Sequence, residues 1–164
     1  MKYLSWLAAV VITTAIHSPE AVAQSKNTAL DAAASRSIID GCVKHSTAKK
    51  QSHAIAVADA SGALLAFLRM DRNSPGVGAF AMKKAEAVAS WRFSTDQMAK
   101  GAESTPGFAN APNVVIVPGG VPVYAQSGEF LGAVGVSGEA PADDAACAVA
   151  GIRAAGFLET PAKR

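Results

Sequence analysis

The chain has 164 residues, of which 50% are hydrophobic and 6% aromatic, and its formal net charge is +2. This length and composition fit one domain with a substantial apolar core. The small net charge and the few aromatic residues exclude a basic nucleic-acid-binding surface and a platform for base stacking.

The N-terminus has the pattern of a secretory signal peptide. Lys2 supplies a positive start, residues 4–16 are mostly apolar, and Ala21-Val-Ala23 matches an A-x-A cleavage site. The alternative is a membrane anchor, but the apolar run is short for a bilayer. We expect a signal peptide over 1–23, a mature domain over 24–164, and a periplasmic or secreted protein with no membrane association after cleavage.

The first half of the mature chain predicts a helix, two strands and two further helices. Apolar residues at helical spacing predict helices over 30–47 and 77–91, and Ser94 is a plausible N-cap for a short helix over 95–103. Residues 53–59 and 63–70 read as two strands joined by the turn Asp59-Ala-Ser-Gly62, which indicates a hairpin.

The second half predicts three apolar strands within residues 114–124 and 130–138, followed by a helix over 141–157. Short connections favour antiparallel pairing, so we expect an α+β domain with one five-stranded antiparallel sheet and flanking helices. Glycines such as Gly132 and Gly135 mark either a bulged strand or the close approach of a backbone or ligand.

Several predicted strands are apolar on both faces, as in Leu64-Leu-Ala-Phe-Leu68. An antiparallel sheet with one solvated face would alternate more cleanly. If the helices cover one face, a second subunit would cover the other, and the chain would be a homo-oligomer. The alternative is that the helices of residues 77–103 cover that second face.

Lys84 falls within the apolar stripe of the helix predicted over residues 77–91. Such a lysine either extends to solvent or pairs with an acid, with Asp59 and Asp71 as candidates. It could instead bind an anionic ligand together with the backbone N–H groups of the loop Pro118-Gly119-Gly120.

The two cysteines allow two interpretations. In an oxidising compartment Cys42 and Cys147 could form a disulfide, or both could be small buried thiols. Together with the remaining histidines they lack the spacing of a zinc site, so no metal site is expected.

Six ordered segments resemble one known family, the GlcG/HbpS-like haem-degrading proteins, which also includes the C-terminal domain of PduO-type cobalamin adenosyltransferases. The matching segments are Ala56-Val-Ala-Asp-Ala-Ser-Gly62, Phe67-Leu-Arg-Met-Asp71, Met82-Lys-Lys-Ala-Glu-Ala-Val-Ala-Ser90, Val117-Pro-Gly-Gly-Val-Pro-Val123, Gly132-Ala-Val-Gly-Val-Ser-Gly138 and Asp143-Asp-Ala-Ala-Cys-Ala148. The resemblance covers residues 30–157. It implies a profilin- or PAS-like fold, higher homo-oligomers, and a haem or tetrapyrrole ligand in some members, which degrade haem or act with a sensor.

An axial haem ligand would be His, Met, Cys or Tyr, and His53 at the start of the first strand is our first choice. Arg69, Lys84 and Arg92 are candidates for the haem propionates. The other candidate axial ligands are His45, Met70, Met82, Met98 and Tyr124.

The sequence contains no recognisable nucleophile–base set and no phosphate loop, so it does not decide whether the protein is an enzyme. The family resemblance and the signal-like N-terminus together imply an exported haem- or tetrapyrrole-binding protein, which is the function we expect. The alternatives are a protein that binds or converts a small anionic metabolite, at Lys84 and residues 118–120, and a non-catalytic accessory subunit.

Overall fold

A computed structural model describes residues 29–161. The elements in chain order are α1 (Ala32–Ala48), β1 (Ala54–Asp59), β2 (Leu64–Arg69), α2 (Pro75–Trp91), α3 (Thr95–Ser104), the 3-10 helix η1 (Phe108–Asn110), β3 (Gly120–Tyr124), β4 (Phe130–Ser137) and α4 (Pro141–Ala154). Within this described part, no helix has the length and apolar character needed to cross a bilayer. The predicted signal peptide lies outside the described residues.

The strands form one antiparallel sheet in the order β2-β1-β4-β3. The α+β class and the antiparallel pairing are confirmed, but the sheet has four strands and the predicted fifth is absent. Residues 114–118 form a loop instead. Val115 in this loop is buried against Ala87 and Met98 of the α2–α3 layer, and the chain turns at Gly119 before it enters the sheet.

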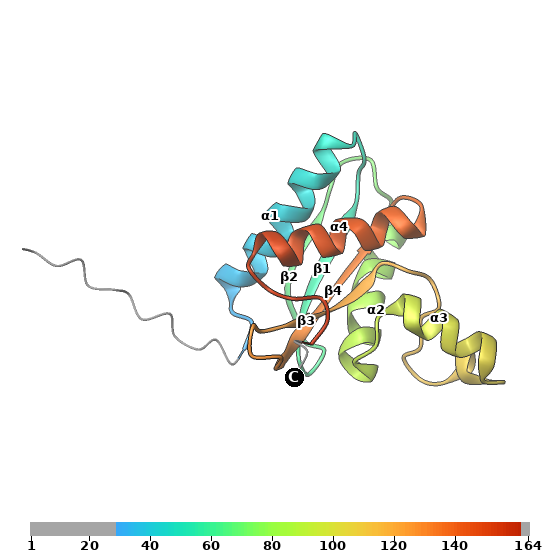
Figure 1. Cartoon of the computed structure of the whole chain (residues 1–164). Helices are drawn as coiled ribbons and strands as arrows, with labels where there is room; N and C mark the ends of the chain where they lie inside the picture. The colour runs from blue at the N-terminus through green and yellow to red at the C-terminus, as the bar shows by residue number, and fades with distance from the viewer. Residues whose placement is uncertain (1–28, 162–164) are drawn as a thin grey trace, which may run out of the picture.

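Helices cover both faces of the sheet (Figure 1). Ile55 and Val57 of β1 pack in a cluster with α1 and α4, whereas Ala54 and Ala56 pack against Ala81 and its neighbours on α2. Because consecutive side chains of a strand point to opposite faces, β1 needs apolar residues at every position. On this second face α2 covers β1, as in the alternative interpretation. The edge strand β2, on which the expectation of a covering subunit was based, keeps most of its side chains exposed, and a covering subunit remains a prediction.

Gly135 of β4 shows why this face uses small residues. A Cβ atom at this position would lie 2.0 Å from the carbonyl oxygen of Ala81 and 2.5 Å from the amide nitrogen of Ala85. The glycine therefore allows the backbone of α2 to approach the sheet closely, which is one of the two roles considered from the sequence.

A disulfide joins the two helices of the other layer. Cys42 of α1 and Cys147 of α4 are bonded, with their Cα atoms 4.8 Å apart, and both are fully buried. Of the two interpretations left open by the sequence, the structure has the disulfide. The predicted final helix is three residues shorter than expected, since α4 ends at Ala154.

Candidate functional site

A buried ion pair at one end of the sheet joins Lys84 of α2 to Asp144 of α4. The Nζ atom of Lys84 is 2.9 Å from Oδ2 of Asp144 and donates a second hydrogen bond to the carbonyl oxygen of Val136 at 2.8 Å. The Lys84 side chain is 0% exposed and the Asp144 side chain 3%. The ammonium also lies 4.9 Å from the ring centroid of Phe80. Lys84 is therefore paired with an acid, but the partner is neither Asp59 nor Asp71.

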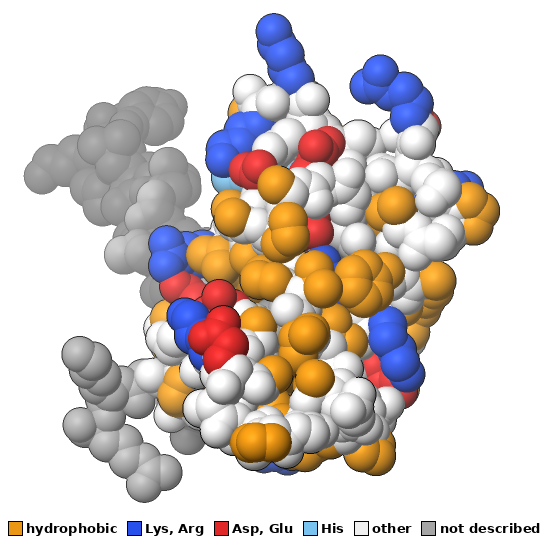
Figure 2. Space-filling model, turned by 90° about the vertical axis from the view of Figure 1, so that its right-hand side faces the viewer, with side chains coloured by type: hydrophobic (Ala, Val, Ile, Leu, Met, Phe, Trp, Pro, Cys, Tyr) orange, Lys and Arg blue, Asp and Glu red, His pale blue; other side chains and the backbone are white. Residues whose placement is uncertain are grey.

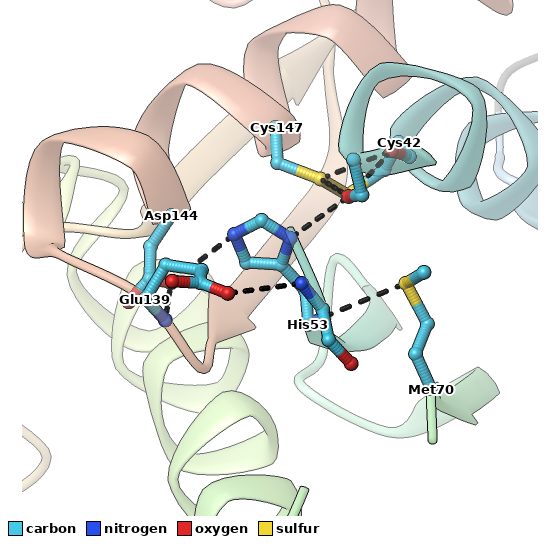
Figure 3. Close-up of a disulfide and its surroundings, with 8 residues drawn as sticks. Cys42, His53, Met70, Glu139, Asp144 and Cys147 are labelled. Atoms are coloured by element: carbon cyan, nitrogen blue, oxygen red, sulfur yellow. Dashed lines mark hydrogen bonds and ion pairs between the residues drawn. A yellow bond between two sulfur atoms is a disulfide. The ribbon is translucent and has the colours of Figure 1, made fainter. Parts of the chain in front are cut away.

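His53 extends this pair toward the disulfide (Figure 3). Its Nε2 atom is 3.6 Å from Oδ1 of Asp144, and its Nδ1 atom is 2.8 Å from the hydroxyl oxygen of Ser46. That hydroxyl oxygen is 3.1 Å from the sulfur of Cys147. One continuous buried cluster, which we call the buried relay, thus consists of Lys84, Asp144, His53, Ser46 and the disulfide.

Burial dominates the protonation of all three ionisable groups in the relay. Burial lowers the pKa of His53, although the nearby Asp144 partly opposes this effect. Burial also lowers the pKa of Lys84 and raises the pKa of Asp144, against the hydrogen bond that the two side chains share. The charges of Lys84 and Asp144 are stabilised in the core by the hydrogen bond between them, so the ionisation of each residue depends on that of the other.

His53 should make the stability of the protein fall in mild acid. The unfolded ring has a pKa of about 6.5, and the folded ring has a lower pKa because it is buried. Below about pH 6.5 the unfolded state therefore takes up the proton first, and stability is lost as pH falls. Asp144 acts in the opposite direction because its pKa is raised in the folded state.

This effect can be isolated by comparing denaturant unfolding of the wild type and of His53→Gln between pH 7.5 and pH 5. The wild type should lose more stability over this range than the variant, whose Asp144 is unchanged. Parallel curves for the two proteins would show that His53 does not titrate as inferred.

The other predicted site residues are only partly brought together. Gly119 lies beside the relay, since a Cβ atom placed on it would be 2.7 Å from Nζ of Lys84. Pro118 precedes it, and the N–H group of Gly120 is already bonded to the Thr95 hydroxyl at 2.9 Å. The loop is near Lys84 as the anion hypothesis requires, but the ammonium is fully buried and an anion would have to replace Asp144.

Arg69 and Arg92 lie outside the relay. Arg69 is exposed at the end of β2 and donates to the carbonyl oxygen of Asn73. Arg92 is exposed at the C-terminus of α2, with its guanidinium 5.0 Å from the ring centroid of Phe130. Phe130 is at the start of β4, at the end of the sheet opposite His53. The predicted cations therefore do not form one site.

Sequence reasoning missed Asp144 and Ser46 as members of the site. The adjacent acids Asp143 and Asp144 lie in the first turn of α4, where carboxylates favour the start of a helix, so their position did not single out Asp144. The one available signal was Lys84 itself, because a lysine on an apolar stripe must reach solvent, an acid or an anionic ligand. Nothing local to the sequence identified which acid it was.

A separate feature, the α1–β2 groove, lies beside the edge strand. It has a volume of about 400 Å³. Four large apolar residues of β2 remain 37–50% exposed: Leu64, Leu65, Phe67 and Leu68. The lining consists of Ala32, Arg36, Ile39, Asp40 and residues 65–68.

The groove fits part of a haem group. Its apolar strand can cover a flat porphyrin face, and Arg36 is a cation that can pair with a propionate. Among residues 29–161, however, those that line the groove include no His, Met, Cys or Tyr, the usual iron ligands. The groove therefore suits the tetrapyrrole ring and its carboxylates, and supplies no ligand to the iron.

The candidate axial ligands lie elsewhere. His53 and Met98 are fully buried, and both ring nitrogens of His53 face protein atoms. Tyr124 is on β3, at the opposite edge of the sheet from β2. Iron ligation by His53 remains a prediction, and the geometry of its ring is against it. Among the described residues, no group of three or more His, Cys, Asp or Glu side chains is arranged to hold a metal ion.

Comparison with known proteins places these features in a family. The family model described as "Haem degrading protein HbpS-like" matches residues 30–153. Protein GlcG of Escherichia coli K12 is 39% identical over 89 residues, which cover 52% of this chain and 64% of GlcG. The aligned region thus spans less than two thirds of the curated relatives it matches.

Solved structures share the fold. A crystal structure of HbpS has a TM-score of 0.70 and 27% identity, covering 77% of this chain and 90% of HbpS. A double mutant of HbpS from Streptomyces reticuli has a TM-score of 0.71 and 26% identity, covering 90% of this chain and 97% of that one. The complex named PduOC:Heme has a TM-score of 0.74 at 20% identity, covering 80% and 99%. With the match over most of its length, the chain belongs to the GlcG/HbpS-like family.

Proposed function

We propose that the protein is an exported tetrapyrrole-binding protein that holds haem in the α1–β2 groove. The family description and the haem complex of a structural neighbour support a haem-related role. The observation that carries the location is the exposed apolar strand β2 beside Arg36. When bound, haem would supply redox-active iron, and the residues of the groove would exclude water from the ring.

Two features favour this groove over the other apolar surface. Hydrophobic side chains also gather on the face of the molecule seen in Figure 2, which carries α2 and α3. A second groove there, beside Phe93 and Phe108, has a volume of about 280 Å³, and no charged residue lines it. The α1–β2 groove is larger and contains Arg36, so it satisfies both the apolar ring and a carboxylate.

Binding should not require the iron. Because the groove offers no iron ligand, metal-free protoporphyrin IX should bind with an affinity within about tenfold of that of haem. Fluorescence quenching of the purified mature protein measures the porphyrin, and the Soret band reports haem. Tight binding of haem with no binding of the metal-free ring would show that an iron ligand dominates and would move the site elsewhere.

Groove variants test the location. Leu68 faces α1 because its partner in the sheet is Ile55, and Leu68→Ser removes apolar contact from the groove. We expect about tenfold weaker binding or more, since a buried leucine contributes about 1.5–3 kcal/mol. Arg36→Gln should weaken the binding of porphyrins that carry free propionates more than the binding of an esterified porphyrin.

Phe93→Ser is the matched control, because Phe93 is 49% exposed and lies in the second groove. It should leave the affinity unchanged. The reverse outcome, in which Phe93→Ser binds porphyrin weakly and Leu68→Ser binds it with wild-type affinity, would place the ligand on the α2–α3 face. Circular dichroism of each variant establishes that it is folded.

Export and assembly are part of the proposal. A periplasmic or secreted location rests on the signal-like pattern of residues 1–23 and agrees with the disulfide. Cell fractionation of the full chain and of a chain lacking residues 1–23 tests it.

We further propose a homo-oligomer, since β2 is an edge strand that remains apolar and exposed. Light scattering with and without haem tests this assembly. A mass that changes with Leu68→Ser together with haem binding would show that copies meet at the groove.

A further inference from the structure

The hydroxyl group of Ser46 connects the disulfide to the buried charges. Its oxygen is 2.8 Å from Nδ1 of His53, 2.9 Å from the carbonyl oxygen of Cys42 and 3.1 Å from the sulfur of Cys147. Ser46, His53 and both cysteines are fully buried. One hydroxyl proton therefore has three possible acceptors, and the surrounding groups decide which of them receives it.

In the oxidised protein, Asp144 on the Nε2 side of the His53 ring determines which acceptor receives the Ser46 proton. The carboxylate of Asp144 lies 3.6 Å from Nε2, which favours a proton on that nitrogen. Nδ1 is then an acceptor and takes the Ser46 proton. The sulfur of Cys147 carries no hydrogen in the disulfide, so it cannot donate to Ser46.

Reduction adds a donor to this arrangement. Thiol–disulfide exchange with a dithiol transfers two electrons and two protons, so the S–S bond is replaced by two S–H groups and the reductant becomes a disulfide. The Cys147 thiol would then lie within reach of Ser46, and a chain of hydrogen bonds could run from Cys147 through Ser46 to Nδ1 of His53. The reduced cluster can thus pass a proton to His53 and leave a thiolate as its counterion.

We propose that the disulfide and His53 form one redox-linked proton switch, in which reduction of Cys42–Cys147 makes His53 take up a proton at higher pH. The charged and titratable groups that face His53 are Asp143 and Asp144 from α4, Glu139 from the loop before it, and His45 from α1. The three acids favour the imidazolium, and His45 opposes it.

Asp144 connects the protonation of His53 to Lys84 of α2, the helix on the other face of the sheet. This carboxylate uses Oδ1 toward His53 and Oδ2 toward Lys84. A protonated His53 competes for the charge of Asp144 and weakens its pairing with Lys84, which lies on α2 beside Gly119. A redox event between α1 and α4 therefore changes the electrostatics beneath residues 118–120.

Nuclear magnetic resonance of histidine-labelled mature protein tests this switch. The His53 ring, assigned by comparison with His53→Gln, is titrated from pH 5 to 8 before and after reduction with dithiothreitol. The midpoint should move upward by about 0.5–1 pH unit on reduction. Ser46→Ala should abolish most of that difference. Ser35→Ala is the matched control, since Ser35 is a buried serine of the same helix whose hydroxyl has no hydrogen-bond partner among residues 29–161; it should retain the difference.

Equal midpoints in the two redox states, or an undiminished difference in Ser46→Ala, would overturn the proposal. If reduction unfolds the chain, two single variants replace it. Cys42→Ala keeps the Cys147 thiol next to Ser46 and should show the higher midpoint, whereas Cys147→Ala lacks that thiol and should not. The same midpoint in both variants would likewise contradict the switch.

Discussion

Replacing Asp144 with asparagine is expected to lower the free energy of unfolding by about 3–5 kcal/mol. The substitution keeps the size of the side chain and removes its charge. Lys84, which is fully buried and 2.9 Å from Asp144, would then have no counterion. Its remaining contacts are the carbonyl oxygen of Val136 and the ring of Phe80, which do not neutralise an ammonium group. Denaturant unfolding at pH 7 measures the loss.

Asp143→Asn is the matched control for this prediction. Asp143 precedes Asp144 in the first turn of α4, but its side chain is 37% exposed, and its Oδ1 atom lies 3.7 Å from Nζ of Lys49, whose side chain is 48% exposed. An exposed pair contributes about 1 kcal/mol or less, so this variant should remain close to the wild type. An Asp144→Asn protein that is also within about 1 kcal/mol of the wild type would show that Lys84 finds another partner or loses its proton at little cost.

The double variant Lys84→Met/Asp144→Leu distinguishes a buried charge from a packing defect. Both charges are removed together, and apolar side chains of similar length fill the space. Replacing a buried ion pair in this way is often neutral or stabilising. We expect the double variant to be more stable than Asp144→Asn, which a purely steric role for Asp144 would not produce.

Removing the disulfide should have an effect of similar size. Cys42 and Cys147 are separated by 105 residues, so their bond closes a loop that includes most of the domain. The loss of loop entropy in the unfolded chain predicts about 4–5 kcal/mol of stabilisation for a loop of this length. The variant Cys42→Ala/Cys147→Ala, which leaves a small apolar residue at each position, should lose stability by that order in denaturant unfolding.

The reduced wild type provides the control for the disulfide. Its stability should approach that of the double variant, since both lack the covalent link between α1 and α4. A double variant as stable as the oxidised wild type would show that the noncovalent packing of the two helices is sufficient. The stability of the double variant can also be compared with that of the oxidised wild type at pH 7 and pH 5.5. This comparison relates to the redox switch, because the double variant has no thiol that could donate to Ser46.

Local patterns in the sequence predicted the elements well. The short helix after Ser94 begins where expected. The Ser94 hydroxyl accepts a hydrogen bond from the backbone N–H of Gln97, and the Gln97 side chain accepts one from the backbone N–H of Ser94. The turn at Asp59 forms because its carboxylate accepts from the amides of Ser61 and Ala63. These contacts join residues at most four positions apart, so they can be recognised from the sequence alone.

The tertiary structure decided the rest. Residues 114–118 are as apolar as a strand, but they pack on α2 and α3 because Val115 finds a buried position there. Apolar character on both faces of β1 was evident from the sequence, whereas only the fold shows that α1 and α4 cover one face of this strand and α2 the other.

The sequence by itself determined that Lys84 must reach solvent, an acid or an anionic ligand, since a charge on an apolar helix face cannot remain unpaired in the core. Only the fold decided that the partner is Asp144, 60 residues away, and that His53, Ser46 and the disulfide continue the cluster. The reason is physical. Periodicity and capping depend on neighbours along the chain, whereas a buried polar cluster depends on which distant segments exclude water together.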